Sequence, residues 1–120
     1  MATSFEDLKV FKLAYKVSLE IHKATLDFPK FEQFVMADQL RRSSRSICAN
    51  IVEGFAKQIQ SKTHFSKYLV DALGSSDETR MWLRYCLDLG YIKKEQWQNW
   101  RNQYQEISKM LTGLIKRLKT

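Results

Sequence analysis

The sequence predicts an all-α protein built from four helices. Apolar residues recur at helical spacing along nearly the whole chain, and its 120 residues include only one proline and four glycines. Turn signals at Pro29, Gln60-Ser61 and Gly90 divide the chain into four blocks. We therefore expect one domain over residues 1–120, with helices at about 5–27, 31–59, 62–89 and 93–118.

The first helix is predicted to begin after Ser4, whose hydroxyl can cap it. It should end near Asp27, because the residue before a proline avoids the α-helical region. Its main apolar stripe consists of Val10, Ala14, Val17, Ile21, Ala24 and Phe28. A second apolar stripe consists of Leu8, Phe11, Tyr15 and Leu19. One core contact buries one stripe, so the second favours a further partner.

The second helix carries a polar stripe opposite its apolar side. Residues at i, i+4, i+8 and i+11 share this stripe, namely Arg42, Ser46, Asn50 and Glu53. Leu40, Ile47 and Ile51 form the opposite side. Gly54 lies inside the helix, where glycine costs about 1 kcal/mol relative to alanine, and close approach of another helix is the usual reason. The stripe therefore predicts a seam for helix packing or assembly.

If the second and third helices form an antiparallel hairpin that turns near residue 60, position 42 faces position 78. This predicts an ion pair between Arg42 and Glu78, within one chain or between subunits. We expect the other polar residues of the stripe to find partners across an interface as well. The predicted seam comprises Arg42, Ser46, Asn50, Glu53, Gly54, Gly74, Ser75 and Glu78.

The third and fourth helices have clear ends and a clear apolar period. Ser61 is expected to cap the third helix, and Gly90 to end it in a left-handed Schellman cap. The fourth helix has apolar residues at alternating spacings of 3 and 4: Trp97, Trp100, Tyr104, Ile107, Leu111, Leu114 and Leu118. Packing within its own bundle is favoured for this seam, with an independent zipper as the alternative.

The third helix, like the first, has apolar residues on two sides. The main stripe is Phe65, Leu69, Ala72, Leu73, Leu83 and Leu87. Roughly opposite lie Val70, Gly74, Met81 and Tyr85. Such doubled apolar faces favour self-association, and a monomer with broad bundle faces is the alternative.

The charge balance suits an acidic partner such as nucleic acid. Lys and Arg number 20 against 13 Asp and Glu, a formal net charge of +7. Candidate phosphate contacts are Lys9, Lys12, Lys16, Lys23, Arg41, Arg45, Lys109, Lys116, Arg117 and Lys119. Binding through them would show little base selectivity and would weaken with salt. The alternatives are a solvated charged face and, at the C-terminal end, compensation of the helix dipole.

The residue pattern favours a protein that is not an enzyme. His22 and His64 lie on different helices without metal-ligand spacing, and no glycine-rich phosphate loop occurs. Cys48 and Cys86 have no obvious base nearby, so we expect packing thiols in a reducing cytoplasm. No apolar run reaches the ~18 residues of a membrane span. We expect no catalytic residue, metal or cofactor, and no membrane partner.

Several motifs resemble one known family over nearly the whole chain. They are RRSSRSICANIVEG at 41–54, GSSDE at 74–78, LGYI at 89–92, FEDLKVF at 5–11 and FP at 28–29. The chain resembles the bacterial four-helix bundle proteins encoded within intervening sequences of 23S ribosomal RNA genes, once labelled S23 ribosomal proteins. It is also similar to the accessory variability proteins of diversity-generating retroelements.

The resemblance implies an antiparallel up-down four-helix bundle that assembles into a homopentamer with a central pore and a basic exterior. In the retroelement branch it implies binding to nucleic acid and to a reverse transcriptase. Two functions follow as hypotheses. The first is a non-enzymatic oligomer that binds RNA or DNA through phosphates with little sequence specificity. The second is a protein adaptor or scaffold, for example for a reverse transcriptase, without direct nucleic-acid binding.

Overall fold

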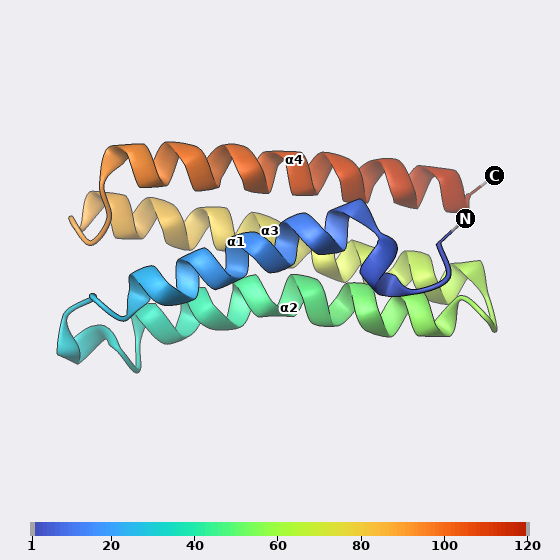
Figure 1. The fold of residues 1–120 in the computed structure, drawn as a ribbon, viewed down its shortest axis with the longest axis horizontal. Coiled ribbons are helices and arrows are strands. Elements are labelled where there is room, and N and C mark those ends of the chain that lie inside the picture. The colour runs from blue at the N-terminus through green and yellow to red at the C-terminus, as the bar shows by residue number, and fades with distance from the viewer. Residues whose placement is uncertain (1, 120) are drawn as a thin grey trace.

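Four long helices lie side by side in the computed structural model, which describes residues 2–119 (Figure 1). They are α1 (Lys9–Thr25), α2 (Met36–Lys57), α3 (Lys62–Asp88) and α4 (Lys94–Leu118), with short 3-10 helices η1 (Phe5–Asp7) and η2 (Lys30–Glu32). No strand forms within residues 2–119, which confirms the all-α prediction. The bundle measures 45 × 23 × 20 Å.

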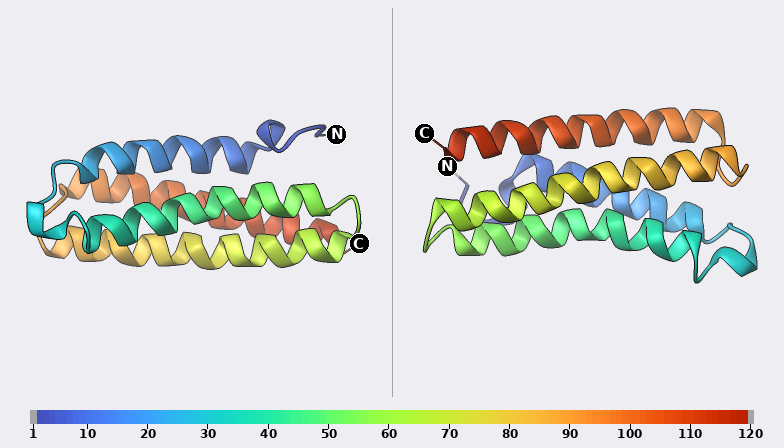
Figure 2. Two further views of the ribbon diagram at one scale, coloured as in Figure 1. Left: turned by 90° about the horizontal axis from the view of Figure 1, so that it is seen from below. Right: turned by 180° about the vertical axis from the view of Figure 1, so that it is seen from behind.

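Each helix packs on two neighbours around a closed square. α2 contacts α1 and α3, and α4 contacts α3 and α1. α1 and α3 are therefore diagonal, and they lie on opposite sides of the bundle in the left view of Figure 2. None of the helices within residues 2–119 is long and apolar enough to cross a membrane.

The core consists largely of the predicted stripes. Fully or nearly fully buried residues include Val10, Ala14, Val17, Ile21, Leu40, Ile47, Ile51, Phe65, Leu69, Ala72, Leu83, Trp100, Tyr104, Ile107 and Leu111. Burying a large apolar side chain of this kind contributes about 1.5–3 kcal/mol. The central part of the α4 seam thus packs within its own bundle, whereas Trp97, Leu114 and Leu118 are half-buried.

The N-terminal helix begins later than predicted. Ser4 does form a capping box, in which its hydroxyl accepts from the Glu6 amide and the Asp7 carboxylate accepts from the Ser4 amide, but it caps η1. Leu8 then takes an extended conformation with ψ 126°, so α1 starts only at Lys9. The helix ends at Thr25, ahead of the predicted Asp27.

The second helix was predicted from residue 31, but it begins at Met36. Side-chain hydrogen bonds explain the difference, because they hold residues 28–35 in the connection between α1 and α2 and not in the α2 helix. The Gln33 amide donates to the carbonyls of Thr25 and Phe28, and the Glu32 carboxylate accepts from the Met36 amide and the Tyr91 hydroxyl. The hydrogen bond from Tyr91 to Glu32, at 2.7 Å, ties this connection to the α3–α4 turn.

Both predicted ends of the third helix are confirmed. The Ser61 hydroxyl accepts from the Thr63 amide at 3.0 Å. At the other end Gly90 has φ 80°, and the amides of Gly90 and Tyr91 donate to Leu87 and Cys86. These two bonds define a Schellman cap, which needs a residue that tolerates positive φ.

Candidate nucleic-acid interface between α3 and α4

The predicted polar seam lies partly between α2 and α3, where hydroxyl groups pair across the contact. The hydroxyls of Ser46 and Ser75 lie 3.0 Å apart, and the Asn50 amide donates to Ser46. One turn away, Thr79 donates to the Ser43 hydroxyl at 2.9 Å and to the Ser75 carbonyl. Every one of these polar groups is satisfied inside the bundle, so the α2–α3 seam is a packing contact.

The two seam glycines differ in their surroundings. A Cβ on Gly54 would lie 2.7 Å from Cβ of Tyr68 and 3.0 Å from a ring carbon of Phe65, so close helix approach explains this glycine. A Cβ on Gly74 would meet nothing within 4 Å. The close-approach explanation is therefore wrong for Gly74 within this chain, because Gly74 lies on the exposed side of α3.

The predicted pair between Arg42 and Glu78 does not form within the chain. Arg42 instead donates to Asp38, one turn earlier on the same helix, at 2.9 Å. Glu78 accepts from the indole N–H of Trp82, and exposed Glu53 has no hydrogen bond within residues 2–119. The pairs Ser46–Ser75 and Ser43–Thr79 lie close to the expected register of α2 on α3. Arg42 and Glu53 nevertheless point outward, whereas Ser46 and Asn50 face α3. A pairing between subunits stays a prediction.

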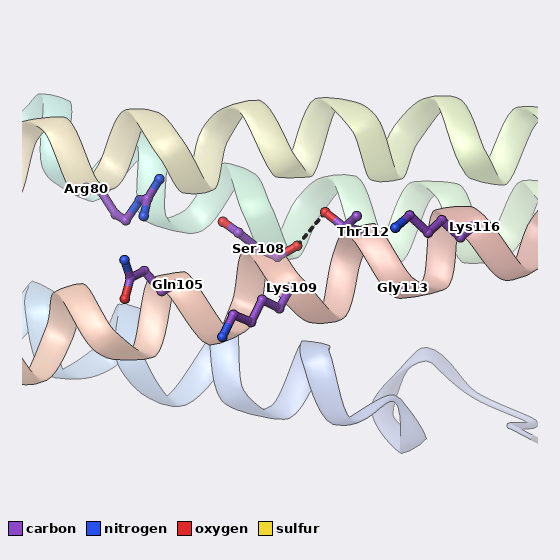
Figure 3. Close-up of a pocket in the computed structure, with 7 residues that line it drawn as sticks. All are labelled: Arg80, Gln105, Ser108, Lys109, Thr112, Gly113 and Lys116. Carbon is purple, nitrogen blue, oxygen red and sulfur yellow. Dashed lines mark hydrogen bonds between the residues drawn. The ribbon is translucent and has the colours of Figure 1, made fainter.

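A groove of about 550 Å³ runs along the outer contact of α3 and α4 (Figure 3). Arg80 comes from α3, and all other lining residues come from α4: Gln105, Ser108, Lys109, Thr112, Gly113 and Lys116. A Cβ on Gly113 would meet nothing within 4 Å, so the missing side chain leaves the floor open. This α3–α4 groove presents cations, hydroxyls and an amide, the donor types that bind phosphate oxygens.

The cations of the groove differ in how far they are neutralised. Lys109 and Lys116 are exposed and form no ion pair within residues 2–119. Arg80 donates to Asp77 at 3.1 Å, and the Ser108 hydroxyl lies 3.4 Å from the same carboxylate. The Nε of Arg80 is buried without a hydrogen-bond partner among the described residues. The groove therefore keeps a net positive charge, since the carboxylate of Asp77 pairs with only one of its three cations.

A second hollow of about 310 Å³ continues the groove toward the start of α4. It shares Arg80 and is also lined by Arg84, Trp97 and Arg101. The guanidinium carbons of Arg84 and Arg101 each lie 5.7 Å from the ring centre of Trp97, in the range of cation–π contact. Arg84 also pairs with Asp88 at 3.0 Å. Indole and guanidinium planes of this kind can stack on bases as well as on each other.

The length of this surface suits an extended polyanion. Trp97 and Lys116 mark its two ends on α4, which at the helical rise are about 28 Å apart. One nucleic-acid strand carries a phosphate every ~3.4 Å, so roughly eight phosphates span that distance. Five cations line it: Arg80, Arg84, Arg101, Lys109 and Lys116.

The predicted lysine stripe lies on a different surface. Lys9, Lys12, Lys16 and Lys23 are all exposed on α1, and Lys16 pairs with Glu20 at 3.3 Å. Lys9 lines a further hollow between α1 and α4 together with Arg117 and Gly113. Exposed Lys119 follows directly after α4. Of the ten predicted phosphate contacts, the α3–α4 groove therefore contains only Lys109 and Lys116.

Arg41 and Arg45 are held by structural contacts. The Arg41 guanidinium donates to the Thr25 hydroxyl at 2.8 Å and to the Gln33 side chain at 2.7 Å, which fastens the α1–α2 connection. Exposed Arg45 donates to the Arg41 carbonyl at 3.2 Å. A phosphate contact by Arg41 would have to compete with two charge-assisted bonds.

Sequence reasoning missed Arg80, Gln105, Ser108 and Thr112, although a signal was present. Positions 105, 108, 109, 112, 113 and 116 recur at spacings of three and one, which places them on one face of α4 opposite the apolar seam. Trp97 was counted with that seam, and its half-exposed ring was overlooked. The sequence alone does not show that Arg80 of α3 joins this face, because that depends on how α3 and α4 are aligned.

The remaining reactive side chains lie apart from the groove. Burial raises the pKa of the Cys48 thiol to about 11 and that of Cys86 to about 12, so both stay protonated near neutral pH. Within residues 2–119, no group of three or more His, Cys, Asp or Glu side chains could hold a metal ion.

Comparison with known proteins agrees with the helical architecture. A family model described as 23S rRNA-intervening sequence protein matches residues 6–113. A crystal structure of a protein with unknown function from the S23 ribosomal protein family of Bacteroides thetaiotaomicron is 34% identical, with a TM-score of 0.77. The match covers 89% of this chain and 98% of that one. Among curated proteins no match is found.

Proposed function

Because this chain belongs to the 23S rRNA-intervening sequence protein family, we propose that it is a non-enzymatic, homo-oligomeric bundle that binds RNA or DNA. The observation that carries this proposal is the α3–α4 groove together with the hollow that continues it, because the two are lined by five cations and the half-exposed Trp97. Contacts to phosphates dominate such binding, so it has little sequence specificity and weakens as salt rises.

The proposal includes the finer architecture that the family resemblance implies. The subunit is an antiparallel up-down bundle, and five subunits assemble in the cytoplasm. The hydrogen bond between Ser43 and Thr79 and that between Ser46 and Ser75 support the up-down order, because rising numbers in α2 pair with falling numbers in α3. Exposed apolar side chains on α1 and α3 support assembly.

Fluorescence anisotropy with an RNA hairpin and a DNA duplex tests nucleic-acid binding. We expect binding at ~50 mM salt and a loss of tenfold or more by ~200 mM. Lys109→Glu with Lys116→Glu should weaken binding further and lower the slope of log affinity against log salt by about 2. Lys62→Glu with Lys94→Glu is the matched control, since it changes the net charge equally outside the groove.

Two results would count against nucleic-acid binding through this groove. No binding of either nucleic acid at ~50 mM salt would reject the proposal. If Lys109→Glu with Lys116→Glu weakens binding no more than the control, binding depends on overall charge. That result would reject the α3–α4 groove as the interface.

One observation favours an adaptor as the second candidate function. The α1–α2 connection exposes Leu26, Phe31, Phe34 and Val35, and Phe34 is 92% exposed. Contiguous exposed apolar residues mark protein contact sites. In this case the chain would hold another protein, for example a reverse transcriptase, without touching nucleic acid. Phe31→Ser with Phe34→Ser would then abolish co-purification with that enzyme and leave the affinity for RNA unchanged.

A further inference from the structure

A largely apolar groove of about 340 Å³ lies between α1 and α2, away from the α3–α4 groove. Its lining includes Tyr15, Ser18, Leu19, His22, Arg45 and Cys48. Tyr15 is 51% exposed and Leu19 45% exposed, so the second apolar stripe predicted for the first helix has no partner within the bundle along this stretch. A hollow of this size can take a bulky side chain.

The outer side of α3 forms an apolar ridge on the diagonally opposite helix. This α3 ridge consists of Val70, Gly74, Met81 and Tyr85, all exposed. It extends about 22 Å at the helical rise. Gly74 lies in the middle of the ridge and costs about 1 kcal/mol relative to alanine, with no close neighbour in this chain. Close approach by a second molecule would account for that glycine.

The charges beside the two surfaces have opposite signs. Around the α1–α2 groove the exposed charged groups are mainly basic: Lys12, Lys16, Lys23, Arg42 and Arg45, with Lys16 paired to Glu20 and Arg42 to Asp38. Beside the α3 ridge the exposed charged groups are mainly acidic: Asp71, Asp77, Glu78 and Asp88, against Lys67 and Arg84, with Arg84 paired to Asp88. Opposite charges around two apolar surfaces favour the contact of one with the other over contact of each with itself.

We propose that the α3 ridge of one copy docks into the α1–α2 groove of a second copy. This inference rests on the homo-oligomer in the proposed function and names its contact surfaces. Because the two surfaces differ and lie on different sides of the bundle, the contact is heterologous. Each added copy leaves one groove and one ridge open until a ring closes.

Two matched variants test this contact by complementation. The groove variant carries Tyr15→Asp and Leu19→Asp, and the ridge variant carries Val70→Asp and Tyr85→Asp, which lie outside the hollows of the proposed nucleic-acid surface. All four side chains are at least 45% exposed in the subunit, so the substitutions leave its core intact. Ile59→Asp, at a position 90% exposed in the α2–α3 turn, is the control for an added charge. The measurement is the native mass from light scattering and native mass spectrometry.

Each variant alone is expected to be monomeric, because a buried unpaired carboxylate opposes docking. An equimolar mixture is expected to give a one-to-one dimer, since each chain still carries the surface that the other needs. Formation of this dimer also shows that both variants are folded. The Ile59→Asp chain should keep the native assembly.

Three results would overturn the inference. If either variant assembles like the unaltered chain, or if the mixture stays monomeric while the unaltered chain assembles, the named surfaces are wrong and the homo-oligomer stands. If the unaltered chain is itself monomeric at all concentrations, both the inference and the homo-oligomer fail. Anisotropy of the same samples with RNA reports separately whether nucleic-acid binding survives.

Discussion

α3 has long contacts with α2 and with α4, and small hydroxyl residues lie at both. The contact with α2 is closed, whereas the contact with α4 leaves an open groove. Toward α2, Ser43, Ser46, Ser75 and Thr79 pair their hydroxyls across a closed seam. Toward α4, one hydroxyl pair at 2.8 Å joins Ser76 to Ser108, and outside it the helices carry Arg80, Lys109 and Lys116 around an open groove.

Glycine position decides much of this difference. Gly54 lacks a side chain where α2 meets α3, so the α2 backbone approaches Phe65 and Tyr68 closely. Gly113 removes a side chain on the outer face of α4, so a hollow remains. Small polar residues therefore indicate a helix contact, and whether that contact is closed or open depends on where the glycine faces.

The largest expected effect separates these two glycines. Gly54→Ala should destabilise the protein by about 1–3 kcal/mol, because the new Cβ lies 2.7 Å from Cβ of Tyr68. Gly113→Ala should stabilise it by about 0.5–1 kcal/mol through helix propensity, with no clash. Urea unfolding measures both changes. Equal effects at the two positions would contradict the distinction between a closed seam and an open groove.

The next effect compares two threonines. Thr79→Val should cost about 1–2 kcal/mol, because a buried hydroxyl that bonds Ser43 and the Ser75 carbonyl is lost. Thr112→Val in the groove should change stability by at most about 0.5 kcal/mol, since Thr112 is half-exposed and bonds only the Ser108 carbonyl. Thermal unfolding of both variants would show whether the seam hydroxyls contribute more.

A smaller effect depends on pH. Burial raises the pKa of Cys86 from 9.0 to about 12, so the folded protein favours the neutral thiol. Stability from this group is complete below pH 9 and is lost as pH rises from about 9 toward 12, with a loss of roughly 1 kcal/mol at pH 10. Urea unfolding at pH 8 and pH 10 should show a smaller decline for Cys86→Ala. An identical decline would mean that water reaches the buried side of α3.

The smallest effect has the opposite sign. The Tyr104 hydroxyl is buried on α4 without a hydrogen-bond partner among residues 2–119. Tyr104→Phe removes this unpaired group and keeps the ring, so stability should stay unchanged or rise by up to about 1 kcal/mol. Calorimetry measures the change in Tm. A clear destabilisation would show that the hydroxyl is satisfied and that α4, like the seam, pairs its buried polar groups.

Much of the fold could be predicted because helical period and turn residues are local properties. The α4 seam from Trp100 to Leu111, the Ser61 cap and the Gly90 cap all follow from neighbouring residues, and all are confirmed. The start of α2 could not be predicted, since it depends on Gln33 and Glu32 reaching residues of other elements. The pairing of Arg42 and Glu78 failed because register alone does not set which side of a helix faces its neighbour.

The candidate site divides in the same way. By itself the sequence determined the positive charge, the basic end of α4 and the family to which the chain belongs. Only the tertiary structure decided that Lys109 and Lys116 share a groove with Arg80, and that Arg41 is engaged by Thr25 and Gln33. The physical reason is that charge and periodicity belong to single segments, whereas a binding surface depends on the relative rotation of two helices.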